Sequence, residues 1–513
     1  MGFEQENKEF INEVDILSKF TPNEEVESLI SFKHNDVGNA KRLIALFGDI
    51  IRFCPEWNEW LYYADGYWQK DIEGNVYAMA RAMLTQLDWQ AKQAENEVLQ
   101  KFASKSGNNS HIEAMLEQAK TFIENDIPVV ADRWDAKHHL LCLKNTTVDF
   151  LLDSKTEFPK IRDHNREDFI TKQLTFDYDE IAECPIWEQF LKDIIPNDDT
   201  RLFVQRAVGY TLTGLTSEDM LFILHGTGSN GKSTFSEVIG EMLGKYSKTI
   251  KPETLIVNDR SSAIKTEIAT ICGARFVKTS EIDEGKRLSE SLVKQLTGGD
   301  TVSTRFLFGK DFEYEPTYKI WISTNHKPKI YGDDDGIWRR ICLIPFTVKI
   351  PEEKKDKFLD IKLKKELPGI FNWALKGLME WKLSGLNPPR QVQEANTEYR
   401  KDEDVLQGFV FDCIERSEQQ SISASVLYNF YKLYCEQNGA VLLSATTFGK
   451  KMHTDKGFER TKSMGKMFYK GIVVKDEVKM NLKTSEFDKD EELNKQKTNE
   501  DYTELADDEK LPF

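Results

Sequence analysis

The sequence predicts a multidomain α/β protein, and three observations lead to this fold class. The 513 residues exceed the length at which a single hydrophobic core normally stops growing. The segment 186–395 alternates apolar strand-like runs with helical runs, as parallel sheets flanked by helices do. Helical periodicity dominates the segment 33–185, and the segment 476–513 is strongly acidic. We therefore expect an α-rich N-terminal domain, a parallel-sheet domain, a small C-terminal domain and a disordered tail.

Composition narrows the class of protein further. Hydrophobic residues make up 40% and charged residues 30% of the chain, the balance of a water-soluble globular protein. No run of about 18 apolar residues occurs and no signal-like start is seen, so we expect no membrane contact and a cytoplasmic location. The net charge of −17 argues against binding nucleic acid over the whole surface, because phosphates repel an acidic body. Any DNA contact must then be a local basic surface.

The N-terminal part shows helical patterning but no metal-binding pattern. Residues 1–32 are an acidic, weakly patterned extension. Two runs, 77–103 and 112–125, repeat apolar residues at helical spacing, with the polar SKSGNNS predicted as the loop between them. The seven cysteines of the chain form no zinc-type cluster. Asp177 and Asp179 have the spacing of a metal-binding pair, but they lie in the short link before the sheet domain, which favours a structural role.

The strongest motif is a phosphate-binding loop in LFILHGTGSNGKST. It follows the apolar strand 220–224 and opens a helix, so the backbone N–H groups and the helix dipole would face phosphate oxygens. Lys232 would neutralise the β- and γ-phosphates of ATP, and the Ser233 hydroxyl would bind Mg²⁺. The residues expected to surround the nucleotide are Gly226, Thr227, Gly228, Ser229, Asn230, Gly231, Lys232, Ser233 and Thr234.

Two further strand ends carry polar groups suited to ATP hydrolysis. RFVKTSEIDEGK supplies Glu281, Asp283 and Glu284 after a short strand, and Glu281 is the first choice for holding magnesium and orienting water. An ordinary acidic loop is the alternative. A helix predicted after these acids is capped by Ser289. The strand YKIWISTN places Asn325 at a third tip, where its amide can bond the attacking water or the γ-phosphate.

The C-terminal segment 396–475 has the outline of a winged helix. EANTEYRKDEDV is predicted to be a linker, followed by a helix over 426–434, a helix N-capped by Ser444, and two strands near 457–461 and 467–474. Contact with duplex DNA is the favoured interpretation, and a solvated basic face on a protein-contact domain is the alternative. The basic residues expected on its exposed side are Lys450, Lys451, Arg460, Lys462, Lys466 and Lys470.

The last residues, ADDEKLPF, resemble the acidic tip of bacterial single-stranded-DNA-binding proteins, although Lys510 departs from the all-acidic run. By this resemblance, Leu511, Pro512 and Phe513 would dock on host replication proteins. A tail that only improves solubility is the alternative.

The order GTGSNGKST, SEIDEGKRL, LTGGDTVSTRFLFGKDFEYEPT, KIWISTNHKP and IWRRICLIPF resembles the phage/plasmid and poxvirus-type primase-helicases of superfamily III, which have an AAA+ core. DVGNAKRL, WLYYADGYW and KNTTVDF resemble the N-terminal domain of that family, with Thr146 standing where glycine is usual. The resemblance spans about residues 33 to 475. Members of that family are often fused to a primase, but residues 1–185 contain no zinc-type cysteine group and no convincing pair of metal-binding acids with a downstream histidine, so primer synthesis is not expected of this chain.

The resemblance also implies roles for individual residues. Glu281 and Asp283 would form the acidic pair, Asn325 the sensor, and Arg340, with Arg339 beside it, an arginine finger that completes the ATP site of a neighbouring subunit. The resemblance also implies a ring, with a hexamer as the expected assembly. The segment around LFGKD reads as a β-hairpin, and in superfamily III helicases a hairpin in this place grips single-stranded DNA in a central channel. The matching residues are Arg305, Phe308 and Lys310. An ordinary exposed hairpin is the alternative.

These patterns predict an ATP-dependent DNA helicase of phage or plasmid replication, working in a bacterial host cytoplasm with ATP and Mg²⁺. Two other functions stay open. An AAA+ origin-binding initiator would bind duplex DNA through the C-terminal domain without displacing strands. An AAA+ remodeller of proteins would hydrolyse ATP with no response to single-stranded DNA.

Overall fold

A computed structural model describes residues 28–151, 158–257, 261–306, 309–331, 335–437, 442–454, 456–463, 465–476 and 478. These residues divide into two compact units. The first runs up to Pro328 and resumes over Arg339–Ala395, and the second combines Lys329–Trp338 with the chain from Asn396 on. No helix in the described ranges is long and apolar enough to cross a membrane.

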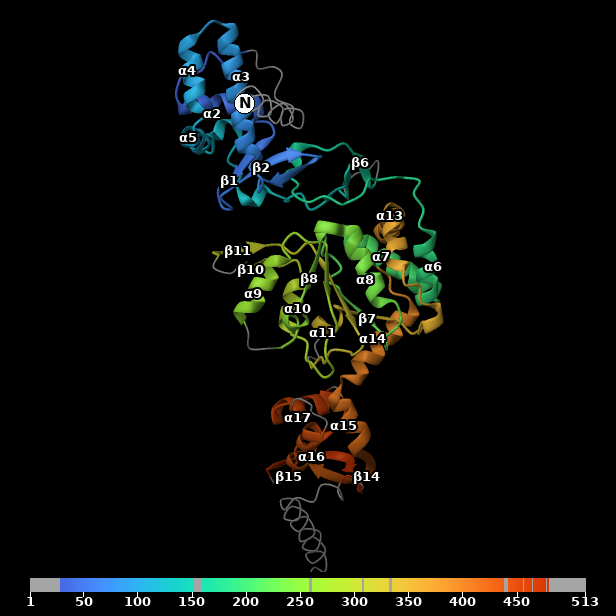
Figure 1. Ribbon diagram of the computed structural model, residues 1–513. Helices are drawn as coiled ribbons and strands as arrows, with labels where there is room; N and C mark the ends of the chain where they lie inside the picture. Colours follow the sequence, from blue (N-terminus) through green and yellow to red (C-terminus); the bar gives the residue numbers. More distant parts are fainter. Residues whose placement is uncertain are drawn as a thin grey trace, which may run out of the picture. The chain divides into compact units, whose positions relative to one another are not determined.

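The N-terminal part of the first unit is rich in helices, as expected, but it also contains two small sheets (Figure 1). The buried side chain of Arg42 donates to the carbonyl groups of Leu29 and Phe32, and these hydrogen bonds hold the segment before α2 (Asp36–Phe47) in place. Both sheets are antiparallel and three-stranded, and their strands of three to six residues left little periodicity to detect. The elements are α2 (Asp36–Phe47), β1 (Ile51–Cys54), β2 (Glu59–Ala64), β3 (Tyr67–Lys70), α3 (Asn75–Gln93), α4 (Glu97–Ser106), α5 (Asn109–Ala119), η1 (Ile123–Asn125), η2 (Ala131–Arg133), β4 (Leu140–Cys142), β5 (Thr147–Asp149), β6 (Lys160–Arg162) and η3 (Arg166–Asp168).

Two predictions for this part change in detail. The run 77–103 is two helices, α3 and α4, because the chain turns at Glu95, which has a positive φ of 51°. Thr146, the departure from the family glycine, lies in the turn between β4 and β5. Its φ is not positive, and its hydroxyl donates to the carbonyl of Arg162 at 2.7 Å. The turn therefore has no need of glycine here.

A five-stranded parallel sheet forms the centre of the first unit, in the order β13-β7-β12-β9-β8. The strands β7, β12 and β13 are mostly apolar and buried because helices cover them. The strand β7 lies between β12 and β13 and places Ile223 beside Ile322 of β12 and Leu343 of β13. The strands are β7 (Leu221–His225), β8 (Ser247–Ile250), β9 (Phe276–Thr279), β12 (Lys319–Thr324) and β13 (Ile341–Pro345).

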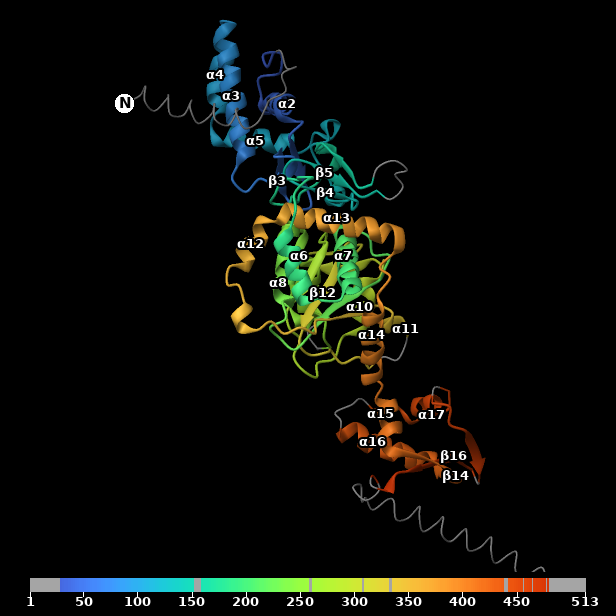
Figure 2. The same ribbon diagram turned by 90° about the vertical axis from the view of Figure 1, so that its right-hand side faces the viewer.

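Helices cover the sheet on the side of Phe222 and Trp321 (Figure 2). Trp187 stacks on Phe235 with ring centroids 5.6 Å apart, which ties α6 to α8. The helices α7 and α13 approach so closely at Gly209 that an added Cβ would lie 2.1 Å from the backbone nitrogen of Leu378. The elements around the sheet are α6 (Pro185–Ile194), α7 (Asp198–Leu212), α8 (Lys232–Leu243), η4 (Gly244–Tyr246), η5 (Pro252–Thr254), α9 (Ser261–Thr270), α10 (Glu290–Thr297), η6 (Glu352–Lys354), α12 (Leu359–Lys365) and α13 (Leu367–Ser384).

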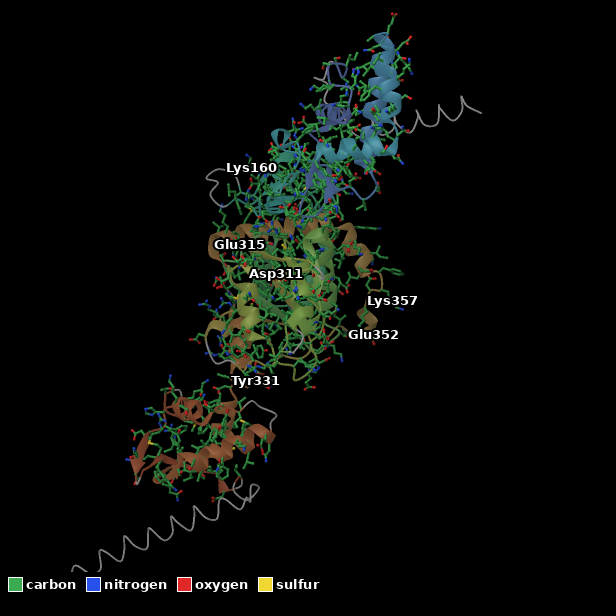
Figure 3. All side chains as sticks on the ribbon, turned by 90° about the vertical axis from the view of Figure 1, so that its left-hand side faces the viewer. Lys160, Asp311, Glu315, Tyr331, Glu352 and Lys357 are labelled. Carbon is green, nitrogen blue, oxygen red and sulfur yellow. The ribbon has the colours of Figure 1, made fainter. Side chains whose placement is uncertain are left out.

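Two connections of the sheet domain matter for the site. Between α10 and β12 the chain forms the predicted hairpin of β10 (Val302–Arg305) and β11 (Asp311–Tyr314). Between β13 and α12 it forms a surface segment, 346–358, on which Glu352 and Lys357 lie (Figure 3). The helix predicted after the acidic residues is present as α10, and Ser289 occupies its N-cap position but makes no side-chain capping hydrogen bond there.

The second unit contains the predicted helices and hairpin, together with one strand that the sequence pattern did not reveal. That strand, β14, pairs with β16, and β15 completes an antiparallel sheet in the order β14-β16-β15. The Ser444 hydroxyl accepts from the Thr447 N–H, as expected of an N-cap. The elements are α11 (Asp335–Trp338), α15 (Val405–Cys413), β14 (Ile414–Ser423), α16 (Ala424–Gln437), α17 (Ala445–Thr454), β15 (Arg460–Ser463) and β16 (Lys466–Val474).

The polar stretch EANTEYRKDEDV is not an irregular linker. Most of it belongs to the helix α14 (Arg390–Asp402). Tyr399 is fully buried and lies edge-on to Trp338, while Glu403 pairs with Lys329 at 3.2 Å. The chain between β12 and β13 is thus anchored within the second unit, through contacts that a local sequence pattern cannot reveal.

Candidate nucleotide-binding site

The predicted nucleotide-binding residues follow three neighbouring strands at one edge of the parallel sheet. The loop 226–231 follows β7, Glu281 comes shortly after β9, and Asn325 follows β12. Because β12 lies between β7 and β9, the three strand ends meet. Ligands of open parallel sheets bind at this carboxyl edge.

The shape of the loop depends on its glycines. Gly226 leaves β7 so close to the continuation of the neighbouring strand that an added Cβ would lie 2.2 Å from the carbonyl oxygen of Phe346. Gly228 and Gly231 have φ values of 91° and 83°, which favour glycine. The helix α8 then begins at Lys232, so its free N–H groups and positive dipole end lie at the loop.

The ammonium group of Lys232 lies at the centre of this site, and the residue is only 5% exposed. It donates to the carbonyl of Gly226 at 2.7 Å and to the amide oxygens of Asn230 and Asn325 at 3.0 Å each. Burial lowers the pKa of Lys232, and the charge of Glu281 partly opposes this effect. The lysine is therefore a cation held among neutral oxygens, ready to exchange them for phosphate oxygens.

Of the predicted acids, the structure brings Glu281 and not Asp283 to this centre. The side-chain amide of Asn325 donates to the carboxylate of Glu281. Ile282 is fully buried, whereas Asp283 and Glu284 are exposed and do not line the cavity. Lys232, Asn325 and Glu281 thus form one hydrogen-bonded chain across three strand ends.

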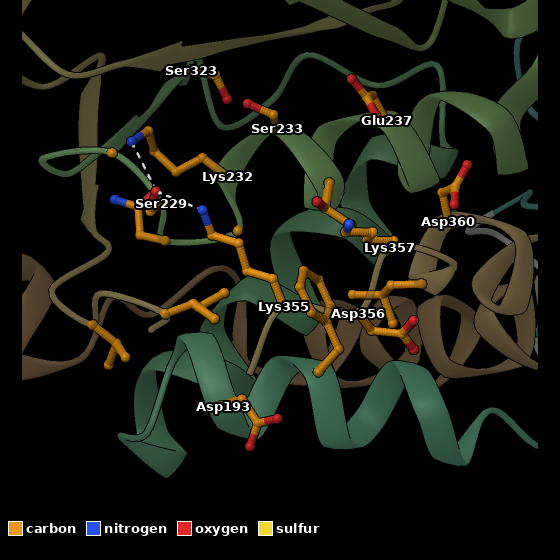
Figure 4. A pocket seen from close by; sticks show the side chains of 18 of the residues that line it. Asp193, Ser229, Lys232, Ser233, Glu237, Ser323, Lys355, Asp356, Lys357 and Asp360 are labelled. Carbon is orange, nitrogen blue, oxygen red and sulfur yellow. Dashed lines mark hydrogen bonds between the residues drawn. The ribbon is translucent and has the colours of Figure 1, made fainter. Parts of the chain in front are cut away.

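A cavity of about 1250 Å³ opens beside this chain (Figure 4). Gly228 to Thr234 line it, together with Glu281 and Asn325, while Gly226 and Thr227 lie outside the lining. The Ser233 hydroxyl and the Glu281 carboxylate are hard oxygen donors at the same cavity. They suit Mg²⁺, which takes one or two protein oxygens and completes its shell with phosphates and water. The described residues contain no cluster of three or more His, Cys, Asp or Glu suited to a metal.

The far wall of the cavity is apolar and was not predicted from the sequence. Ile186 and Phe190 come from α6, and Val348, Ile350 and Leu359 come from the chain after β13. These groups are separated by more than 150 residues in the chain, so no local motif could indicate them. An apolar wall beside a phosphate loop can hold the base of a nucleotide.

The arginine pair lies at the opposite edge of the sheet. Arg340 precedes β13, and its carbonyl accepts from the N–H of Leu221 at the start of β7. The length of β13 separates it from the phosphate loop of its own chain by about 16 Å. The Arg340 guanidinium donates to Thr297 and Asp219 at 3.2 and 3.5 Å, and its side chain is 11% exposed. The Arg339 side chain is 64% exposed and lies 3.7 Å from Asp219.

The predicted DNA-binding hairpin exposes both described basic residues, Arg305 and Lys310, while Phe308 lies outside the described residues. Phe306, which no sequence pattern singled out, is 52% exposed and stacks on Phe312 with centroids 5.3 Å apart. Asp311 faces Arg305 across the hairpin. The tip thus carries mixed charge and an exposed ring.

In the second unit, Lys450, Arg460, Lys462, Lys466 and Lys470 are exposed and Lys451 is half-buried. The terminal residues Leu511, Pro512 and Phe513 lie outside the described residues.

The fold and the site together have the arrangement of a P-loop protein, with a glycine loop between a parallel strand and a helix. The sequence matches three family models in order along the chain. Their descriptions are D5 N terminal like over residues 40–196, a family of unknown function over 224–340, and Poxvirus D5 protein-like over 401–506. The chain therefore carries D5-type primase-helicase domains, and the predicted resemblance to superfamily III is confirmed.

Curated relatives come from large DNA viruses. The "Putative helicase L207/L206" of Acanthamoeba polyphaga mimivirus is 29% identical over 328 residues, covering 59% of this chain and 34% of that protein. The "Putative helicase 184R" of Invertebrate iridescent virus 6 is 25% identical, covering 63% of this chain and 36% of that protein. A "Putative primase" of African swine fever virus is 24% identical, covering 58% and 32%. The chain spans about a third of the length of these relatives.

Among solved structures, the NrS-1 C-terminal region is 13% identical with a TM-score of 0.43, covering 86% of this chain and all of that one.

Proposed function

We propose that this chain is an ATP-driven DNA helicase of viral replication that works as a ring. The relatives' names support a role as a replicative helicase or primase. The observation that carries the helicase proposal is the chain of hydrogen bonds from Lys232 through Asn325 to Glu281. It joins a phosphate-binding lysine to a carboxylate that can orient water, which hydrolysis of a triphosphate requires.

Within the site, we assign the following tasks to the residues. Lys232 and the N–H groups at the start of α8 bind the phosphates, and the Ser233 hydroxyl and Glu281 would hold Mg²⁺, which when bound neutralises charge on the phosphates. The Glu281 carboxylate orients the attacking water and accepts its proton. The Asn325 amide keeps that carboxylate beside the γ-phosphate position. Asp283, the second predicted acid, would act from outside the cavity.

The position of the arginine pair supports a site completed by a second subunit. An arginine at the amino edge of the sheet cannot reach the nucleotide bound at the carboxyl edge of the same sheet. The family resemblance favours Arg340 as the finger, with Asp219 and Thr297 orienting it. Greater exposure favours Arg339. In either case hydrolysis requires subunits in contact, and we propose a hexameric ring because the family resemblance implies one.

The hairpin of β10 and β11 is proposed to hold single-stranded DNA. Lys310 and Arg305 would contact phosphates, and an exposed ring, Phe306 or Phe308, would stack on a base. Neither contact depends on the identity of the base, and a motor that moves along DNA of any sequence requires such contacts. Because the net charge of −17 repels DNA from the surface as a whole, the proposal requires a locally basic channel, to which Arg305 and Lys310 would contribute although Asp311 faces Arg305.

Strand displacement on a forked duplex tests this function. Wild type should separate the strands with ATP, Lys232→Ala should not, and Lys310→Ala should hydrolyse ATP without separating them. Binding of duplex DNA with no displacement would favour an origin-binding initiator acting through the basic residues of the second unit. ATP turnover that ignores single-stranded DNA would favour a protein remodeller.

We also propose that the terminal Leu511-Pro512-Phe513 recruits replication proteins of the host. Removal of the last eight residues should then lower recovery of these proteins from host extract. Equal recovery with and without the tip would leave the tail a solubilising role.

A further inference from the structure

We infer that Lys355 is a second phosphate-binding cation of the nucleotide site, supplied by the segment that follows β13. This inference rests on the proposed ATPase function and names a residue that no phosphate-loop motif contains. Lys355 lies on the segment 346–358, more than 120 residues after the loop it would assist.

Backbone contacts hold this segment against the phosphate loop. The N–H of Phe346 donates to the carbonyl of His225, and the N–H of Ile350 donates to the carbonyl of Ser229, both at 2.7 Å. The Asn230 amide donates to the carbonyl of Phe346 at 3.3 Å. The segment therefore follows the loop closely, and its side chains have defined positions at the mouth of the cavity.

The ammonium of Lys355 lies at the loop itself. It donates to the Ser229 hydroxyl at 3.3 Å (Figure 4), and it also pairs with the exposed Glu352 at 2.6 Å. Its side chain is 39% exposed, so it is neither buried in the core nor directed fully into solvent. A phosphate bound in the loop would offer a charged acceptor in place of a neutral hydroxyl, and such hydrogen bonds are about twice as strong.

The charge balance of the cavity explains why a second cation is needed. The residues lining it include five carboxylates but three lysines, namely Asp193, Glu237, Glu281, Asp356 and Asp360 against Lys232, Lys355 and Lys357. Without Lys355, only Lys232 and Lys357 would offset these carboxylates and the charge of a triphosphate. Asp356 is already paired with Lys362 at 2.6 Å, whereas Lys355 contacts the loop directly.

The same segment carries a matched control. Lys349 is exposed and does not line the cavity, although its neighbours Val348 and Ile350 do. Lys349→Met therefore removes one positive charge from the same segment without touching the site. Lys355→Met removes the proposed contact, and Lys355→Arg keeps a cation there.

Binding of a fluorescent ATP analogue with magnesium to the full chain tests the inference, with ADP and AMP as competitors. We expect Lys355→Met to weaken ATP roughly tenfold and to leave AMP within about twofold, while Lys349→Met and Lys355→Arg stay near wild type. If Lys355→Met matches Lys349→Met for ATP, or weakens ATP and AMP equally, the inference is wrong. If Lys232→Ala also binds ATP like wild type, the proposed function itself fails, so the two failures are distinguishable.

Discussion

Lys232 donates a hydrogen bond of 3.0 Å to the side-chain oxygen of Asn325, whose amide nitrogen donates in turn to Glu281. A residue of the phosphate loop and a residue at the tip of the neighbouring strand are thus in direct contact. Binding of a triphosphate would draw Lys232 toward phosphate oxygens and leave Asn325 and Glu281 free to position water. Recognition of the phosphates and activation of water are coupled through this amide.

Removal of this amide should affect turnover more than binding. We expect Asn325→Ala to lower kcat roughly 100-fold, the usual effect of losing one positioned polar group, while the affinity for ATP changes less than about fivefold. Steady-state ATPase assays and equilibrium binding measure the two effects. Ser323→Ala, which removes a hydroxyl bonded to Ser236 at the same cavity, is the control and should keep most activity. An equal loss in both variants would argue against a special role for Asn325.

The hairpin should be needed for DNA but not for hydrolysis alone. Lys310→Ala and Phe306→Ala should keep the basal ATPase rate and lose its stimulation by single-stranded DNA, because both side chains lie outside the nucleotide cavity. The salt dependence of DNA binding should also become shallower in Lys310→Ala, by about 0.7 in the log–log slope for each phosphate that is no longer neutralised. Glu313→Ala, on the same hairpin, is the control. If single-stranded DNA still stimulates the ATPase rate of both variants, the hairpin does not couple DNA binding to hydrolysis.

Stability of the second unit should depend on Glu403 as a hydrogen-bond acceptor. Its carboxylate accepts from the N–H of Ile330 and from Lys329, both at 3.2 Å. Glu403→Ala would leave the buried N–H unpaired and should lower the free energy of unfolding by about 1–3 kcal/mol. Glu403→Gln keeps an acceptor and should cost less than about 1 kcal/mol. Denaturant unfolding measures both, and equal losses would contradict the assignment.

The same residue predicts a pH dependence. Burial raises the pKa of Glu403 above its ordinary value of 4.5, with Lys329 opposing the shift. The native protein therefore holds this proton more tightly than the unfolded chain, and its stability falls as pH rises from 4.5 through the raised pKa. Glu403→Gln lacks this loss, so its stability relative to wild type should improve over that window. Parallel pH profiles for the two proteins would contradict the shift.

The sequence predicted those parts of the molecule in which neighbouring residues determine the outcome. The phosphate loop, the hairpin of β10 and β11, and the N-cap at Ser444 depend on the spacing of residues close together in the chain. The helix α14 was missed because its sequence is polar and resembles a linker. Its helical structure is explained by the burial of Tyr399 and of the following Glu403 within the second unit, which a local pattern does not show.

Long-range contacts account for the rest. The apolar wall of the cavity and Lys355 come from segments far from the phosphate loop, and only the register of β13 beside β7 brings them to it. Arg340 is buried and donates to Thr297, which is distant in sequence, whereas Arg339 is exposed, although both arginines lie near Asp219. Residue type alone could not tell the two arginines apart.

A mixing experiment tests the central claim most directly, because a site shared between two subunits can be rebuilt from two inactive chains. Lys232→Ala lacks the phosphate-binding lysine. The double variant Arg339→Ala, Arg340→Ala lacks the arginines proposed to complete the site of a neighbouring subunit. Each alone should show almost no ATP turnover. When the two variants are mixed in equal amounts in the presence of single-stranded DNA, they should recover a substantial fraction of the wild-type rate. Some subunit interfaces then contain both an intact phosphate loop and an intact arginine pair. A mixture that stays as inactive as its components, or an arginine variant that turns over ATP at the wild-type rate, would contradict a site shared between subunits.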